Sequence, residues 1–238
     1  MRGGPATLVV ADRGASAEAP EHTIAAYELA LGQGADALVL DLHAARDEEP
    51  VVIHDFTLER TTDGAGPVVD RTVRDLKRLD AGGWWDARFA GQRVQALHEV
   101  LERFRQRAGF VLVLRGGRAC YPTLAERVVA LAEIYEVVHR VLVVSLDRDA
   151  LGEVRALNDA VAVGVLVPPG APLPAGPPGS AVCVEGRALS AGAVAGLRGV
   201  ACYAWAVREP AEAERLAGWG VRGVVTDRPG PIATRLGR

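Results

Sequence analysis

Two residues that can exchange protons lie on either side of a predicted turn. Residues 38–43 form an apolar run containing Asp41, residues 47–50 (Asp-Glu-Glu-Pro) predict a turn, and residues 51–54 return to His54. If the turn is centred between residues 47 and 48, antiparallel pairing places His54 opposite Asp41. The local pattern therefore predicts a histidine beside a carboxylate, a pairing suited to general acid or base catalysis.

The elements that must position these groups alternate between strand and helix. Short, almost continuously apolar Val/Leu-rich runs are typical of parallel strands covered on both faces. The predicted strands comprise residues 7–11, 36–43, 110–115, 141–145, 161–167, 181–185, 201–206 and 222–226. The predicted helices comprise residues 22–33, 96–107, 123–138, 148–158, 190–197 and 209–219. We therefore predict an α/β fold, a (β/α)8 TIM barrel, with functional groups on the loops that follow the strands.

The length of 238 residues suits a single TIM-barrel domain, residues 1–238. Residues 44–95 form a long excursion after the second predicted strand, and we interpret them as a small cap insertion with Trp84 and Trp85 in its wall. Residues 168–180 are too rich in proline for a helix and predict a rigid surface loop.

The composition of the chain indicates which kinds of binding partner and cellular location to expect. A formal charge of −3, a pI of about 6.0 and the lack of a basic cluster argue against nucleic acid. No segment is apolar enough over the length of a membrane span. The three cysteines, Cys120, Cys183 and Cys202, fit neither a disulfide framework nor a zinc site, so a reducing cytoplasm is the expected location.

Five motifs point to a known family. They are residues 34–62, Ala-Asp-Arg-Gly at 11–14, Pro-Glu-His-Thr at 20–23, Leu-Asp-Ala-Gly at 79–82 and Thr-Asp-Arg-Pro at 226–229. With these motifs the chain resembles the glycerophosphodiester phosphodiesterase family along nearly its whole length. That resemblance implies a divalent metal held by three carboxylates and two histidines acting as general acid and base. It also implies a reaction that splits a phosphodiester into glycerol 3-phosphate and an alcohol.

Several of the positions that would carry this chemistry hold other residues. The first family histidine falls on Asp12, and the second survives as His54. Of the three metal ligands, Asp41 survives, while Val39 and Val113 stand where the family has glutamates. Hydrocarbon side chains coordinate no metal, so Asp41 is a residual ligand that we expect to lack a cation. The resemblance thus gives His54 and Asp12 as candidate catalytic residues.

The cations that face the phosphate in the family persist as Arg13 and as Arg115, which replaces a lysine. These two are the candidate substrate-binding residues. With Asp12 and Asp41 opposite Arg13 and Arg115, the charges in the pocket balance without a metal. Arginines and carboxylates at such a site can satisfy one another through charge-assisted hydrogen bonds.

Three other residues are candidate substitutes for the missing groups. His43 shares the strand face of Asp41, His22 lies in the loop after the first strand, and Glu185 ends a predicted strand at the same mouth. Glu21 and Thr23 have the pattern of a helix start.

Three functional hypotheses follow. The first is a degenerate family member, a pseudoenzyme that lacks metal-dependent hydrolysis, needs no cofactor and keeps a pocket for a small phosphate-containing ligand. The alternative is an active phosphoric diester hydrolase of lipid metabolism with a rebuilt site, in which Mg²⁺ or Ca²⁺ binds Asp12 and Asp41 with His43 or Glu185. The third is a scaffold or protein-interaction barrel.

Overall fold

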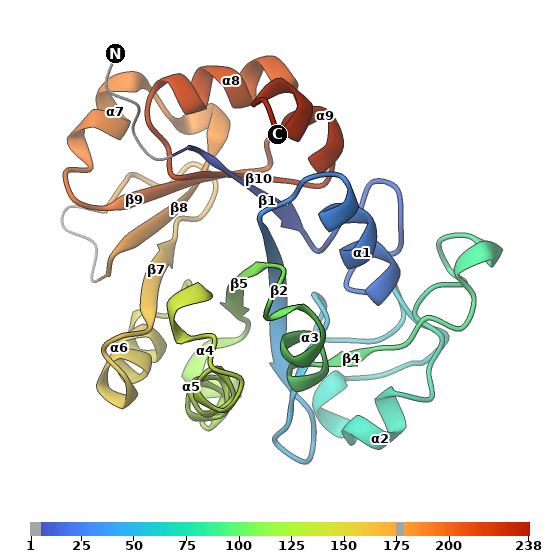
Figure 1. Ribbon diagram of the computed structural model, residues 1–238. Helices are drawn as coiled ribbons and strands as arrows, with labels where there is room; N and C mark the ends of the chain where they lie inside the picture. Colours follow the sequence, from blue (N-terminus) through green and yellow to red (C-terminus); the bar gives the residue numbers. More distant parts are fainter. Residues whose placement is uncertain (1–5, 175–178) are drawn as a thin grey trace.

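Eight parallel strands close into a barrel in the computed structural model, which describes residues 6–174 and 179–238. Their order around the barrel is β1-β10-β9-β8-β7-β6-β5-β2, and pairing of β1 with β2 closes the ring (Figure 1). The bounds are β1 Leu8–Asp12, β2 Ala37–Ala44, β5 Gly109–Leu114, β6 Val141–Ser145, β7 Ala162–Leu166, β8 Ala181–Glu185, β9 Ala201–Trp205 and β10 Gly223–Thr226. The predicted (β/α)8 barrel is confirmed, and every predicted strand matches one of these within two residues.

Helices surround the strands, as Figure 1 shows for α5, α6, α8 and α9. The bounds are α1 Ile24–Gly32, α3 Leu97–Phe104, α4 Gly117–Cys120, α5 Leu124–Ile134, α6 Arg148–Leu157, α7 Ala191–Gly196, α8 Pro210–Gly218 and α9 Pro229–Arg235. Short 3₁₀ turns add η3 Val138–Arg140 and η4 Gly186–Ala188. Within residues 6–174 and 179–238, no helix has the length and hydropathy that a membrane crossing requires.

Helix α9 lies beyond the last predicted helix, residues 209–219, and is an addition to the prediction. Pro229 and Pro231 lie in the first turn of this helix, where a missing backbone N–H costs nothing. Between β7 and β8 the described residues form no helix, consistent with the prolines there. Residues 175–178 of the predicted rigid loop lie outside the described part of the chain.

The barrel strands bury both faces, and alternation along β2 separates two cores. Leu38, Leu40 and Leu42 point outward and pack in the cluster that includes α1, α3 and α5. Val39 points inward with the valines of β5. All eight residues of β2 are buried, including Asp41. The Asp41 carboxylate is therefore buried among apolar side chains, where it needs hydrogen-bond or ion-pair partners.

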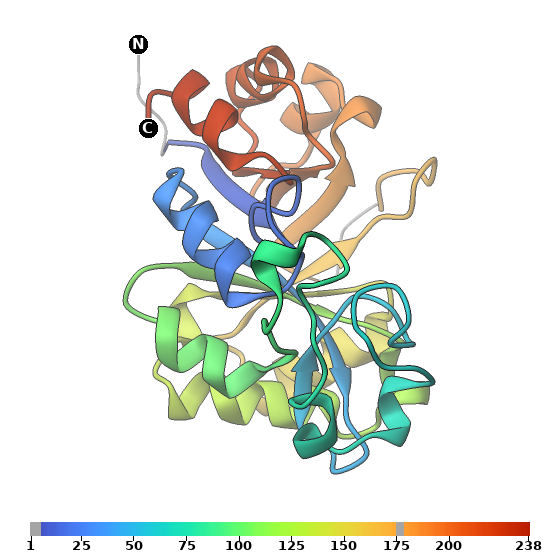
Figure 2. The same cartoon turned by 90° about the vertical axis from the view of Figure 1, so that its right-hand side faces the viewer.

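Residues 44–95 lie on one side of the barrel (Figure 2). They contain β3 Pro50–Val52, η1 Val68–Asp70, α2 Val73–Leu76 and η2 Ala87–Phe89, and β4 Gln95–Ala96 ends the segment and leads into α3. Their apolar side chains form a small core of their own, built from Ala45, Val51, Ile53, Leu58, Val68, Leu76, Ala81 and Val94. The rings of Trp84 and Trp85 pack edge to face and each residue is 38% exposed.

The hairpin register differs from the prediction by one residue. Leu42 pairs with Val52, and the Ile53 amide donates to the Asp41 carbonyl at 3.0 Å, so His54 is not opposite Asp41. The cause is the turn, in which Glu48 adopts a left-handed conformation (φ 60°). A type I turn followed by one left-handed residue adds a residue to the loop and shifts the pairing.

The first loop after a strand depends on close contact with α1. Gly14 has φ +85°, and a Cβ there would lie 2.7 Å from the carbonyl carbon of Ala26. We predict that Gly14→Ala lowers the free energy of unfolding by about 2–4 kcal/mol, since overpacking and a strained backbone add. Urea denaturation tests this, with Gly152→Ala in α6 as control, where a Cβ meets nothing within 4 Å. Equal midpoints for the two variants would contradict it.

Candidate active site

Asp41 is the centre of a charged cluster inside the mouth of the barrel. Its Oδ2 lies 3.0 Å from His22 Nε2 and 3.2 Å from Arg13 Nε, and its Oδ1 lies 3.8 Å from an Arg115 terminal nitrogen. Burial alone would raise the pKa of Asp41, but the hydrogen bond and charge of His22, together with Arg13 and His54, lower it to about 2. Asp41 is therefore an ionised carboxylate engaged by three side chains.

The loop between β1 and α1 presents Arg13 and His22 in an unusual backbone conformation. Both residues are left-handed, with φ of 60° and 59°, and the His22 amide donates to the Arg13 carbonyl at 3.0 Å. The conformation is costly for residues other than glycine, at about 1–3 kcal/mol each, and tends to occur at functional sites. His22 Nδ1 also lies 3.0 Å from the Tyr27 hydroxyl, so α1 fixes the ring that binds Asp41.

A cavity of about 270 Å³ opens beside this cluster. Its polar lining comes from Asp12, Arg13, Asp41, His54 and Arg115, and the rest comes from inward-facing residues of the barrel strands. The latter are Val39, Val111, Val113, Val144, Leu166, Cys183, Trp205 and Val225. Thus all five predicted site residues, Asp12, Arg13, Asp41, His54 and Arg115, line one cavity.

His54 is tied to the rest of the mouth through an ionic network. Its Nδ1 lies 2.6 Å from Asp55 Oδ1, and Arg60 bridges Asp55 to Glu21 with contacts of 2.8 Å to both Glu21 oxygens. Glu21 in turn accepts from Arg13 at 3.1 Å. Burial lowers the pKa of His54, although Asp41 and Asp55 oppose that shift. Arg60 thus links the His54 loop to the Arg13 loop.

Asp12 ends β1 beside Arg13, whose Nε lies 3.9 Å from Asp12 Oδ1. Loss of solvation raises the pKa of Asp12, and the Arg13 charge opposes the rise. The side chain keeps 35% of its surface exposed, so solvent limits the rise. Asp12 is therefore a stronger proton acceptor than a fully solvated carboxylate.

The three candidate substitutes, His22, His43 and Glu185, lie in different places relative to the cavity. His22 joins the Asp41 cluster, as described above. His43 is fully buried, with Nδ1 2.8 Å from the Tyr121 hydroxyl and Nε2 3.1 Å from the His54 carbonyl, and it does not line the cavity. Glu185 pairs with Arg187 and also does not line the cavity. Neither His43 nor Glu185 is placed to complete a metal shell with Asp41.

Two hydrogen-bond donors in the cavity lining lack an acceptor among the described residues. They are the indole Nε1 of Trp205 and Nε of Arg13, which is near Asp41 but without hydrogen-bond geometry. Buried donors without acceptors are rare in proteins and are commonly explained by a ligand or water. The mouth therefore has donor capacity that the protein itself does not use.

The family metal does not fit the side chains present. A hard divalent cation takes six or more oxygens, but Val39 and Val113 supply none and the Asp41 carboxylate is already paired with cations. In the described part of the chain, no three His, Cys, Asp or Glu residues cluster in a way that could hold a metal ion. That the protein works without a metal stays a prediction.

The sequence pattern did not reveal four residues of this site in their present roles. The pattern around Glu21 predicts only a helix start, and no motif assigns a role to Arg60 or Trp205. His22 was one of several substitutes. The sequence gives little indication of these roles. Arg60 and its partner Glu21 are 39 positions apart in the chain, and Trp205 is distinguished only as the last residue of β9.

His43 provides a test of the buried network around the site. Burial lowers its pKa to about 4, so the folded protein resists protonation that the unfolded chain accepts below pH 6.5. We predict that stability falls by about 2–3 kcal/mol as pH drops from 6.5 to 4, and that His43→Gln removes this part of the slope. Urea unfolding across this pH range measures it, with the exposed His139→Gln as control. Parallel slopes for wild type and His43→Gln would refute the assignment.

Comparisons with known proteins identify relatives of this chain. The model of the "Glycerophosphoryl diester phosphodiesterase family" matches residues 13–176 and 179–231. A "Glycerophosphodiester phosphodiesterase" of Caldanaerobacter subterraneus subsp. tengcongensis is 34% identical over 233 residues, covering 94% of this chain and 95% of the relative.

Solved structures agree. A glycerophosphodiester phosphodiesterase from Agrobacterium tumefaciens superposes with a TM-score of 0.82 at 30% identity, covering 96% of this chain and 99% of that one. An Oleispira antarctica phosphodiesterase "in complex with the product sn-glycerol-3-phosphate" gives a TM-score of 0.86 at 25% identity, covering 98% of both chains. The chain therefore belongs to the glycerophosphoryl diester phosphodiesterase family.

Proposed function

We propose that this protein binds glycerophosphodiesters at the mouth of the barrel and hydrolyses their phosphodiester bond, with arginines supplying the positive charge that a metal supplies elsewhere in the family. The observation that carries the proposal is the cavity in which Arg13, Arg115, His54 and the indole N–H of Trp205 converge. The names of its relatives support the same reaction, since they are glycerophosphodiester phosphodiesterases.

The cavity suits a phosphodiester anion. Guanidinium groups match phosphate oxygens in geometry and retain their charge at all relevant pH values. Arg13 has a raised pKa, because the charges of Asp12, Asp41 and Glu21 outweigh its burial. Arg13 and Arg115 also lie beside Asp41, so their charges offset the repulsion between that carboxylate and a bound anion.

The remaining groups can move protons for hydrolysis. Water attacks phosphorus and passes its proton to Asp12, and the bond from phosphorus to the alcohol oxygen breaks. His54, protonated, donates its proton to that oxygen, so the products are glycerol 3-phosphate and an alcohol. Arg13 and Arg115 offset the charge that develops on the phosphoryl oxygens. The bound anion itself favours protonated His54.

A second candidate is binding without hydrolysis, as the sequence pattern first suggested. The observation in its favour is that Asp12, Val39 and Val113 occupy the places of a family histidine and two metal ligands. The comparisons support the family and its reaction and give no sign that activity has been lost. A pure scaffold role would have been favoured by a mouth filled with side chains, whereas the cavity measures about 270 Å³.

Turnover of glycerophosphocholine separates the two candidates. We predict choline release that persists in EDTA and falls about 100-fold or more in His54→Gln, since general acid catalysis contributes that much. His139→Gln, an exposed histidine on η3, is the control and should retain full activity. No turnover in a protein that still binds glycerol 3-phosphate would favour the binding candidate and defeat hydrolysis.

Anion binding has its own prediction. Arg115→Gln should weaken the affinity for inorganic phosphate by about 10–100-fold, the effect of losing one charge-assisted hydrogen bond. Isothermal titration calorimetry at constant ionic strength measures this, with the exposed Arg155→Gln on α6 as control. Unchanged affinity in Arg115→Gln would show that the cavity does not bind anions through this residue.

The lost metal shell can be rebuilt. We predict that Asp12→His combined with Val39→Glu and Val113→Glu creates a protein that Mg²⁺ or Ca²⁺ stabilises by mass action, because two new buried carboxylates need a cation. Thermal melts with and without each metal test this, and the unmodified protein should show no shift. A folded triple variant with neither stabilisation nor metal-dependent turnover would mean that other parts of the site have diverged.

A further inference from the structure

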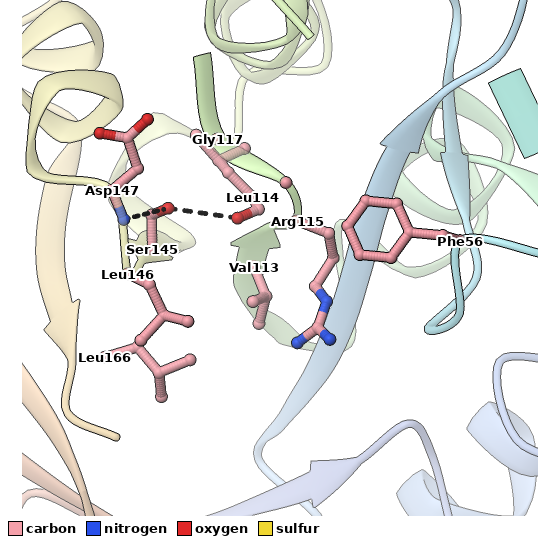
Figure 3. A pocket seen from close by; sticks show the side chains of 10 residues that line it. Phe56, Val113, Leu114, Arg115, Gly117, Ser145, Leu146, Asp147 and Leu166 are labelled. Carbon is pink, nitrogen blue, oxygen red and sulfur yellow. Dashed lines mark hydrogen bonds between the residues drawn. The ribbon is translucent and has the colours of Figure 1, made fainter. Parts of the chain in front are cut away.

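A second cavity adjoins the candidate active site. Its volume is about 470 Å³, and it shares Val113, Arg115 and Leu166 with the smaller cavity that contains Asp41 and His54. Figure 3 shows Leu146 and Leu166 on one side and Phe56 on the other, with Val113 and Arg115 between them. The remaining lining comes from Leu114, Gly116, Gly117, Ser145 and Asp147. Arg115 thus stands where the charged site meets a mainly apolar groove.

Two large apolar side chains of this groove are exposed to water, which is unfavourable in free energy. Phe56 is 48% exposed and Leu146 is 59% exposed, and both lie on loops that follow strands at the mouth of the barrel. Phe56 is held in place by an edge-to-face contact with the buried ring of His43, at 4.7 Å between centroids. Clustered exposed apolar residues beside a pocket commonly mark a ligand-binding surface.

The charges around the groove disfavour a cationic occupant. Arg115 would repel an ammonium group, and the Asp147 carboxylate accepts from the amides of Arg118, Asp149 and Ala150. Those backbone hydrogen bonds, the largest of them from Arg118, lower the pKa of Asp147 and engage its charge. Between these two residues the lining consists of hydrocarbon, glycine and Ser145, whose hydroxyl donates to the Leu114 carbonyl. A hydrocarbon chain fits these surroundings better than a choline or ethanolamine group.

We propose that the groove binds the hydrocarbon substituent of a single-chain phosphodiester amphiphile, taken as a monomer from solution, whose phosphate lies on Arg115 and Arg13. This inference rests on the proposed function and names its substrate class. Arg115 lines both cavities, so a phosphate bound to it can keep the ester oxygen of the leaving alcohol near His54, while the hydrocarbon on that oxygen extends toward Phe56 and Leu146. The polar glycerol side and the apolar side of the substrate would then occupy separate parts of the mouth.

The test is a series of methyl n-alkyl phosphates, from ethyl to octyl, titrated below their critical micelle concentrations by calorimetry. We expect affinity to rise about two- to fourfold for each added methylene, as partial to full burial of each group predicts. Leu146→Ser should flatten this dependence while leaving the affinity for inorganic phosphate unchanged. Leu157→Ser, which changes an exposed leucine at the end of α6, should keep the wild-type dependence.

The outcomes separate this inference from the proposed function. A flat series in a protein that binds inorganic phosphate would overturn the inference and leave the phosphate site standing. Tighter binding of methyl phosphocholine than of methyl butyl phosphate would also overturn it, in favour of a cationic headgroup. If neither inorganic phosphate nor any member of the series binds, the proposed function itself fails.

Discussion

The structure of the mouth depends on one buried carboxylate. Asp41 is 4% exposed and lies among the inward-facing valines of β2 and β5, where an unpaired charge would cost several kcal/mol. Arg13 and His22, both from the loop between β1 and α1, surround it together with Arg115, which follows β5. Removal of any one of these partners would leave the charge less well compensated. The cluster therefore restricts the conformation of the first loop, including the left-handed backbone of Arg13 and His22.

The same cluster is the basis of the anion site that we propose at the mouth. The guanidinium groups that neutralise Asp41 are those that a phosphate would contact, so ligand and carboxylate compete for the same charge. The indole N–H of Trp205, which has no acceptor among the described residues, supplies a hydrogen bond outside that competition. The Arg60 bridge holds His54 and Arg13 in fixed relation across the cavity, because it joins Asp55 to Glu21. The mouth thus combines positive charge, hydrogen-bond donors and a proton-transfer group, although the described residues contain no set of metal ligands there.

The parts of this picture that could be predicted from the sequence are those set by short-range periodicity. Nearly continuous apolar runs indicated each barrel strand, and strand alternation placed Val39 and Asp41 on the same inward face. Parallel strands then brought Asp12, Arg13 and Arg115 to one end of the barrel. His54 lines the same cavity as these residues, as predicted. The predicted pairing of His54 with Asp41 across the hairpin was wrong by one residue.

What could not be predicted depends on backbone conformation and on contacts between distant segments. The hairpin register follows from the left-handed conformation of Glu48, which no residue type at that position signals. His43 was expected on the Asp41 face, but the end of β2 turns it toward Tyr121 and away from the cavity. The roles of Glu21 and Arg60 arise only when the first loop and residues 44–95 fold together.

The central claim is that Arg13 and Arg115 carry the charge that a metal carries elsewhere in the family. A crystal structure with glycerol 3-phosphate, grown once in EDTA and once in millimolar Ca²⁺ with anomalous data, tests it most directly. We expect phosphate oxygens within hydrogen-bond distance of both guanidinium groups in both crystals, with Asp41 still paired to His22. An anomalous calcium peak on Asp41, with phosphate present only in that crystal, would contradict it.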